Sequence, residues 1–129
     1  MGQRYLIDSN VLIDYTSSRL PLKGSDFAEH IFNTDFLISV ALKIEVLGFD
    51  EVPDKIQRME EFINTALLLT LDESVTKQTI LLRRQHKNLK LGDAIIAATA
   101  LVYDLILLTR NTSDFKNILG LKSVNPHDL

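Results

Sequence analysis

The fold is decided by the stretch YLIDSNVLID, residues 5–14, in which a short apolar run ends in a carboxylate and a helical pattern follows. The run predicts a buried strand over residues 4–7, closed by Asp8, and residues 10–15 have the spacing of a short helix. Apolar runs then alternate with helical patterns to the end of the chain. This alternation is typical of an α/β fold with a mainly parallel sheet.

The other elements follow from periodicity and turn residues. Asp26 and Glu29 form a capping-box pattern, which predicts a helix that runs to Asn33 after a loop at residues 17–24. Further strands are predicted at residues 36–39, 68–71, 106–109 and 122–124, and further helices at residues 41–47, from 53 to about 67, after the cap Asp72, at 93–103 and at 113–119.

Length and composition narrow the class of protein. A chain of 129 residues is long enough for one domain with its own core. It contains no cysteine, which excludes disulfides, zinc–cysteine sites and thiol catalysis. Its apolar runs are far shorter than the roughly 18 residues that a membrane-spanning helix needs. We therefore expect a single soluble domain of the cytoplasm, without a membrane partner.

Four carboxylates, those of Asp8, Glu45, Asp93 and Asp114, stand in stretches that are otherwise apolar or turning. Burying a charge there is costly unless the charge is paired, and the chain does not place four suitable lysines or arginines nearby. Carboxylate oxygens are the ligands that Mg²⁺ or Mn²⁺ prefers. Because ligands collect at the carboxyl ends of parallel strands, the pattern predicts a metal site there, and hence phosphodiester hydrolysis.

Each acid also has a purely structural interpretation. Asp8, Asp93 and Asp114 could each cap the helix that follows, and Glu45 could be an exposed helical residue. Taken singly, each acid fits the structural interpretation, whereas their joint placement favours the metal site.

A basic run is open to two interpretations. Arg83, Arg84, Lys87 and Lys90 lie within eight residues of one another, with His86 among them. The run is either a solvated helix face or a patch that attracts phosphate groups. A net charge of −3 argues against a general nucleic-acid coat protein, but not against a nuclease. His30, His86 and His127 lie outside the motifs and are interpreted as surface or packing residues.

Several segments together resemble PIN-domain ribonucleases and, among these, the VapC-type toxins of bacterial toxin–antitoxin pairs. The resemblance covers nearly the whole chain. The segments are LIDSNVLID (residues 6–14), ISV through EVLG (38–48), LGDAIIAATA (91–100), LTRN followed by DF (108–115) and Asn125-Pro126. The resemblance implies a PIN-like three-layer fold, with a mainly parallel sheet of four or five strands between helices.

The same resemblance implies roles for individual residues. Asp8, Glu45 and Asp93 match the acidic triad that holds Mg²⁺ or Mn²⁺, and Asn10 and Thr109 match positions that hydrogen-bond the carboxylates. Many relatives carry a fourth acid where this chain has Asn111, with Asp114 three residues later. We expect Asn111 to face the site and leave Asp114 open as a fourth ligand or a helix cap. Ser9 stands where relatives often have threonine.

Two functions are compatible with these features. The first is a metal-dependent endoribonuclease that acts as a toxin, pairs as a homodimer and is neutralised by a cognate antitoxin. Arg110 or the basic residues Arg83, Arg84 and Lys87 would then contact RNA phosphates. The second is a catalytically weak PIN-like module that binds RNA or protein without efficient cleavage, which the neutral Asn111 favours. A phosphoacceptor signalling domain fits poorly, since there is no acidic pair ahead of the first strand and no lysine after the fourth.

Overall fold

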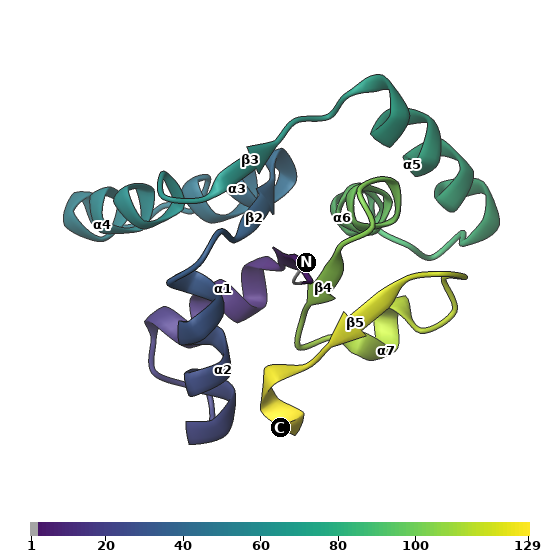
Figure 1. Cartoon of the computed structure of the whole chain (residues 1–129). Coiled ribbons are helices and arrows are strands. Elements are labelled where there is room, and N and C mark those ends of the chain that lie inside the picture. The colour runs from purple at the N-terminus through teal and green to yellow at the C-terminus, as the bar shows by residue number, and fades with distance from the viewer. Residues whose placement is uncertain (1–2) are drawn as a thin grey trace.

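In the computed structural model, which describes residues 3–129, a five-stranded parallel sheet forms the centre of the molecule (Figure 1). Its strands are β1 (Tyr5–Ile7), β2 (Leu37–Ser39), β3 (Leu67–Leu69), β4 (Ile106–Leu108) and β5 (Lys122–Val124), and they lie in the order β3-β2-β1-β4-β5. The order places β1 in the middle, between β2 and β4. The predicted α/β class with a parallel sheet is confirmed.

Helices cover both faces of the sheet, because successive side chains of each strand point to opposite faces. Leu6 and Leu107 pack with α5 (Glu73–Gln85), α6 (Leu91–Val102) and α7 (Thr112–Phe115) in one core cluster. Ile7 and Leu108 pack on the other face, with α1 (Ser9–Thr16), α2 (Leu22–Phe32), α3 (Val40–Leu47) and α4 (Pro53–Ile63). These three layers match the predicted architecture, and burial on both faces explains why the inner strands β1, β2 and β4 are almost wholly apolar.

Short polar side chains fix several helix starts. Asp8 is the N-cap of α1, and its carboxylate accepts a hydrogen bond from the backbone N–H of Ser9. The hydroxyl of Ser39 accepts a hydrogen bond from the backbone N–H of Leu42 at the start of α3. Asp72 caps α5 as predicted, since it accepts a hydrogen bond from the backbone N–H of Val75. The first two caps stand at strand ends, so α1 and α3 start at the carboxyl edge of the sheet.

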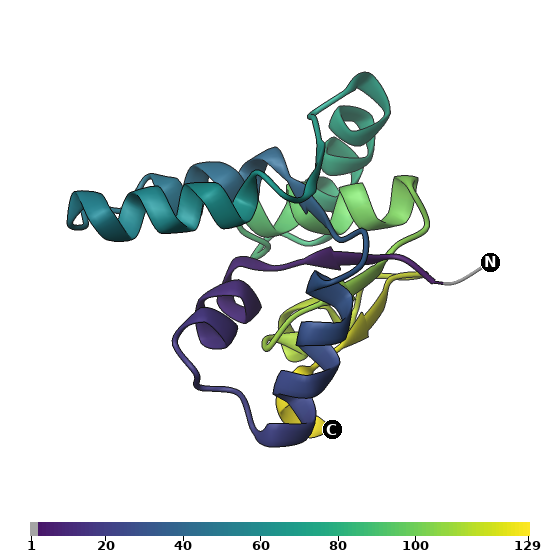
Figure 2. The ribbon, with the colours of Figure 1, turned by 60° about the vertical axis from the view of Figure 1, so that its left-hand side comes forward.

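The predicted start of α2 is wrong. The helix begins at Leu22 after Pro21, so residues 22–24 belong to the helix and not to the preceding loop, and the pattern at Asp26 is not a cap. Gly24 is buried against the short 3₁₀ helix η1 (Pro126–Asp128): a Cβ on Gly24 would lie 2.0 Å from the carbonyl oxygen of Pro126. Both views show α2 beside the C-terminal segment (Figure 1, Figure 2). This packing outweighs the turn tendency of proline and glycine.

Other boundaries shift by a few residues. α4 stops at Ile63, and β3 runs from Leu67, which was predicted on the face of that helix, to Leu69. α6 begins at Leu91, with Lys90 in the cap position, so that Asp93 lies inside its first turn. α7 covers only Thr112–Phe115. Among residues 3–129, no helix combines the length and apolar character that crossing a membrane requires.

Candidate functional site

Asp8 is a buried carboxylate at the carboxyl end of β1, and only 4% of the residue is exposed. Its Oδ1 accepts a hydrogen bond from the Ser9 backbone N–H (2.8 Å), and its Oδ2 accepts from the Thr109 hydroxyl (2.8 Å) and the Asn10 amide (3.3 Å). Burial raises the pKa of the Asp8 carboxyl above its ordinary value, although these bonds oppose the rise. Thr109 and Asn10 therefore lie where the resemblance implies.

Glu45 reaches the same region from α3. Its Oε2 accepts a hydrogen bond from the Ser9 hydroxyl (3.1 Å). Its Oε1 lies so near the start of α6 that a Cβ on Gly92 would be 2.6 Å away. Glycine lets the carboxylate keep this position, whereas a larger residue would force it to move, which gives a physical reason for the Gly92-Asp93 pair in the sequence.

Asp93 lies next to Gly92 in the first turn of α6 and is half-buried. Burial is the first cause that raises the pKa of the Asp93 carboxyl; the negative charges of Asp8, Glu45 and Asp114 add to it, and Lys90 opposes it. A helix N-terminus normally favours a carboxylate, so burial and like charge outweigh that preference here. Three acids from distant parts of the chain thus act on the Asp93 carboxyl at this edge of the sheet.

The raised pKa of Asp93 predicts how the metal-free protein responds to pH. The folded state holds this proton more tightly than the unfolded chain, so stability falls as the pH rises from about 3.8 through the folded-state pKa. We expect Asp93→Asn to raise the melting temperature at pH 7 in the presence of a chelator. The gain should shrink as the pH falls toward 3.8. Melting curves of both proteins across this range check the prediction, and a gain independent of pH would contradict it.

Two hollows flank the acids. The first, about 440 Å³, is lined by His86, Lys87, Asn88, Leu89, Lys90, Asp93, Asp114, Asn117 and Ile118. The second, about 330 Å³, is lined by Ser9, Asn10, Ile13, Asp14, Arg19, Glu45, Phe49 and Arg110. Lys87 of the basic run therefore reaches the site, whereas Arg83 and Arg84 lie in the last turn of α5 and line neither hollow.

The two candidates for the fourth position, Asn111 and Asp114, lie in different surroundings. Asn111 is exposed, lines neither hollow, and donates its backbone N–H to the Thr109 hydroxyl (3.1 Å). Asp114 lines the first hollow together with Asp93 and contributes to the raised pKa of that residue. It is not the cap of α7, because the cap position belongs to Asn111. The lining of the first hollow thus favours Asp114 over Asn111 as the residue at the fourth position.

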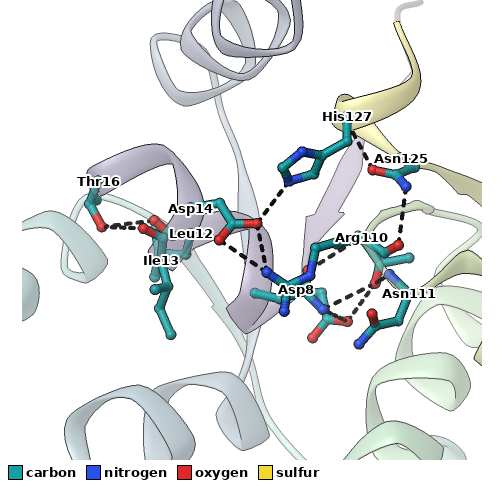
Figure 3. A network of polar contacts seen from close by, with 11 residues as sticks. Asp8, Leu12, Ile13, Asp14, Thr16, Arg110, Asn111, Asn125 and His127 are labelled. Atoms are coloured by element: carbon teal, nitrogen blue, oxygen red, sulfur yellow. Dashed lines mark hydrogen bonds and ion pairs between the residues drawn. The ribbon is translucent and has the colours of Figure 1, made fainter. Parts of the chain in front are cut away.

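A fifth carboxylate, that of Asp14, was not singled out by the sequence. It is buried, and its two oxygens lie 3.2 and 3.0 Å from Nη1 of Arg110, while its Oδ2 lies 2.9 Å from Nε2 of His127 (Figure 3). Arg110 was expected to contact RNA and His127 to be a surface or packing residue. The sequence did contain one signal that Asp14 has a partner. Asp14 stands one helical turn after the apolar Val11, and a charge on an apolar helix face needs a partner.

The geometry and the chemistry of the acidic side chains decide whether a divalent cation fits between them. Among residues 3–129, no three Asp, Glu, His or Cys side chains are placed so that they could hold a metal as they stand, so the expected close triad is not preformed. The donors are nevertheless all oxygens; burial disfavours the charged forms of Asp8 and Asp93, and at Asp93 the repulsion from neighbouring acids adds to it. A cation would relieve that repulsion, and Mg²⁺ keeps several waters and needs few protein ligands. The chemistry of the residues therefore fits Mg²⁺ or Mn²⁺.

Known proteins of similar sequence and structure lead to the same family. "Ribonuclease VapC" of Rickettsia bellii (strain RML369-C) is 25% identical over an alignment of 127 residues, which covers 91% of this chain and 92% of that protein. A toxin–antitoxin complex from Klebsiella pneumoniae contains a chain that is 33% identical, with a TM-score of 0.77 over 95% of this chain and 97% of that one.

The chain in the VapBC2 complex from Rickettsia felis, solved bound to a promoter DNA fragment, shares the fold. Its TM-score is 0.80 at 18% identity, over 95% of this chain and 98% of that one. The sequence model of the PIN domain matches residues 5–120, which span the strands β1 to β4 of the sheet and the four acids. The chain belongs to the PIN domain family, as its motifs predict.

Proposed function

We propose that this protein is a metal-dependent endoribonuclease and the toxin of a toxin–antitoxin pair. The observation that carries the proposal is the Asp93 carboxyl at the carboxyl edge of a parallel sheet, under the negative charges of Asp8, Glu45 and Asp114. A relative named as a ribonuclease supports RNA as the substrate. The similar toxin–antitoxin complex supports an antitoxin as the partner.

Each residue of the site has a separate role in the proposed reaction. A bound divalent cation would lower the pKa of a coordinated water and offset the charge of the scissile phosphate. Asp8 and Asp93 are the residues that would hold it, with Glu45 acting through water. The Thr109 hydroxyl and the Asn10 amide fix the direction of Asp8 Oδ2. Lys87, on the rim of the first hollow, can attract the RNA backbone toward Asp93.

An apolar groove supports the antitoxin as the partner. It measures about 690 Å³, is lined by residues of α1, α3 and α4, and shares Ile13 and Phe49 with the second hollow beside Glu45. An antitoxin segment lying in this groove could extend a basic side chain toward the carboxylates and block the site. We also infer a homodimer, which the exposed apolar side chains of Ile80 and Leu81 on α5 and of Leu67 and Leu68 on β3 support.

Cleavage of defined RNAs tests the proposal. The purified protein should cut RNA at internal positions in Mg²⁺ or Mn²⁺ and lose this activity in a chelator, since the charge of the cation contributes several kcal/mol at the transition state. Product lengths on a denaturing gel measure the effect. Binding of RNA without cleavage in either buffer would instead support the catalytically weak PIN-like module, which the neutral Asn111 and the absence of a preformed triad among residues 3–129 favour.

Asp114 and Asn111 can be separated by one pair of variants. Asp114→Ala should lower both the affinity for Mg²⁺ and the rate of cleavage by about tenfold or more, which is the effect of replacing an outer residue of a metal site. Its melting temperature should change little, because the residue is exposed and is not the cap of α7. Asn111→Ala is the matched control and should have a smaller effect on Mg²⁺ titration curves. A destabilised Asp114→Ala with wild-type turnover would show that the residue is structural.

A further inference from the structure

The buried carboxylate of Asp14 joins three distant segments of the chain. It lies on α1 with 1% of the residue exposed. Both of its oxygens contact Nη1 of Arg110, which follows β4, and its Oδ2 contacts Nε2 of His127 in η1 (Figure 3). A buried carboxylate that loses its partners is strongly destabilised, so these contacts resist displacement. Asp14 is therefore a firm anchor for the segment that carries Arg110.

The main chain of Arg110 is held on both sides as well. Its backbone N–H donates to Oδ1 of Asn10 (2.9 Å), and its carbonyl oxygen accepts from the Asn125 amide (3.1 Å). Asn125 in turn accepts the backbone N–H of His127 (2.9 Å), the same residue whose ring contacts Asp14. The side chain and the backbone of Arg110 thus belong to one closed network.

This network is connected to the Asp8 carboxylate of the candidate site. Thr109, the residue before Arg110, donates its hydroxyl to Oδ2 of Asp8 and accepts the backbone N–H of Asn111. Asn10, which holds the Arg110 N–H through its oxygen, donates its amide to the same Oδ2. The hydrogen bonds that Oδ2 of Asp8 accepts from Thr109 and Asn10 therefore both come from residues that touch or adjoin Arg110.

We propose that Asp14, together with Arg110 and His127, is a positioning residue: it fixes the segment after β4 and, through Thr109 and Asn10, the orientation of the Asp8 carboxylate. The role rests on the function proposed above, in which Asp8 holds the cation. Arg110 then acts through its contact with Asp14, and a direct phosphate contact by Arg110 is the competing role. A carboxylate at a reacting centre has to be held to about 0.5 Å, and a rigid outer contact serves that purpose.

Asp14→Asn tests the proposal, since it keeps the shape of the side chain and removes its charge. We expect turnover of RNA in Mg²⁺ to fall about 10- to 100-fold with little change in KM, as for other outer residues of metal sites. Calorimetric affinity for Mn²⁺ without RNA should fall in parallel. Exchange of the Arg110 and Asn111 backbone N–H groups should become faster while that of the central strands stays slow, a pattern that general destabilisation does not produce.

The matched control is Asp104→Asn. Asp104 forms an exposed pair with Lys122 and has a φ of 53°, which asparagine tolerates, so this variant should behave as wild type in all three measurements. If Asp14→Asn does not fold, Arg110→Lys provides the second test. It keeps a positive charge beside Asp14 but replaces the planar guanidinium with a flexible point charge. The same three changes are expected from it.

The outcomes separate the competing roles. A raised KM and a weaker salt dependence in Arg110→Lys, with unchanged Mn²⁺ affinity, would assign Arg110 to a phosphate and overturn the proposal. Wild-type Mn²⁺ affinity and wild-type exchange in a folded Asp14→Asn would overturn it too. If the wild-type protein cleaves no RNA, the proposed function fails, whereas Mn²⁺ affinity and amide exchange still decide the role of Asp14.

Discussion

Asp93→Asn is expected to lower RNA cleavage in Mg²⁺ by about two to three orders of magnitude while the protein stays folded. The substitution removes the charge of a side chain that would hold the cation. The cation stabilises the transition state by several kcal/mol, and each 1.36 kcal/mol corresponds to a factor of ten in rate. The fold should survive because Asp93 is half-buried among like charges that disfavour its ionised form. Single-turnover cleavage and a melting curve measure the two effects.

Asp54→Asn provides the control for this prediction. Asp54 also stands in the first turn of a helix, α4, but lines neither hollow that flanks the acids. It therefore reports what the loss of a first-turn carboxylate does to the helix alone, typically 0.3–1 kcal/mol. Asp8→Asn should match Asp93→Asn in activity but lose stability, because an amide cannot accept all the hydrogen bonds that Asp8 receives. Wild-type turnover in Asp93→Asn would refute the assigned role.

The predicted parts of the fold and site follow from rules that act locally or at a sheet edge. Apolar runs and helical spacing were enough for the strands and layers, because both faces of a parallel sheet are buried. Since such strands end at one edge, Asp8 and Thr109 were expected near each other although 101 residues separate them. Ser39 likewise starts the helix that carries Glu45 toward the same edge.

The features that the sequence did not predict depend on contacts between distant residues, which no local pattern indicates. Asp14 contacts Arg110 and His127, which are 96 and 113 residues away in the sequence. Nothing near any of the three residues indicates the pairing. The start of α2 depends on Gly24 packing against Pro126, which overrides local turn chemistry. Whether Asn111 or Asp114 faces Asp93 depends on where the short helix α7 begins, and a shift of one residue there turns a side chain by about 100°.

Gly92→Ala is expected to lower cleavage by roughly 10²-fold, the effect of a displacement near 1 Å at a reacting centre, without loss of stability. The added Cβ would lie 2.6 Å from Oε1 of Glu45, closer than such atoms approach, and the flexible side chain would move away rather than the helix. Glu45 would then lose its hydrogen bond from Ser9. Alanine also favours the helix by up to about 1 kcal/mol over glycine, so melting temperature should stay or rise.

A double-mutant cycle shows whether the new methyl group acts through Glu45. Glu45→Ala removes the carboxylate and should itself reduce cleavage. In that background Gly92→Ala has nothing left to displace and should cost little, so the combined loss is far smaller than the product of the single losses. Losses that multiply would mean that Gly92 acts on Asp93 or on the helix instead. A drop in activity with rising stability, abolished by Glu45→Ala, would connect the glycine of the Gly92-Asp93 pair to the chemistry of the site rather than to its folding.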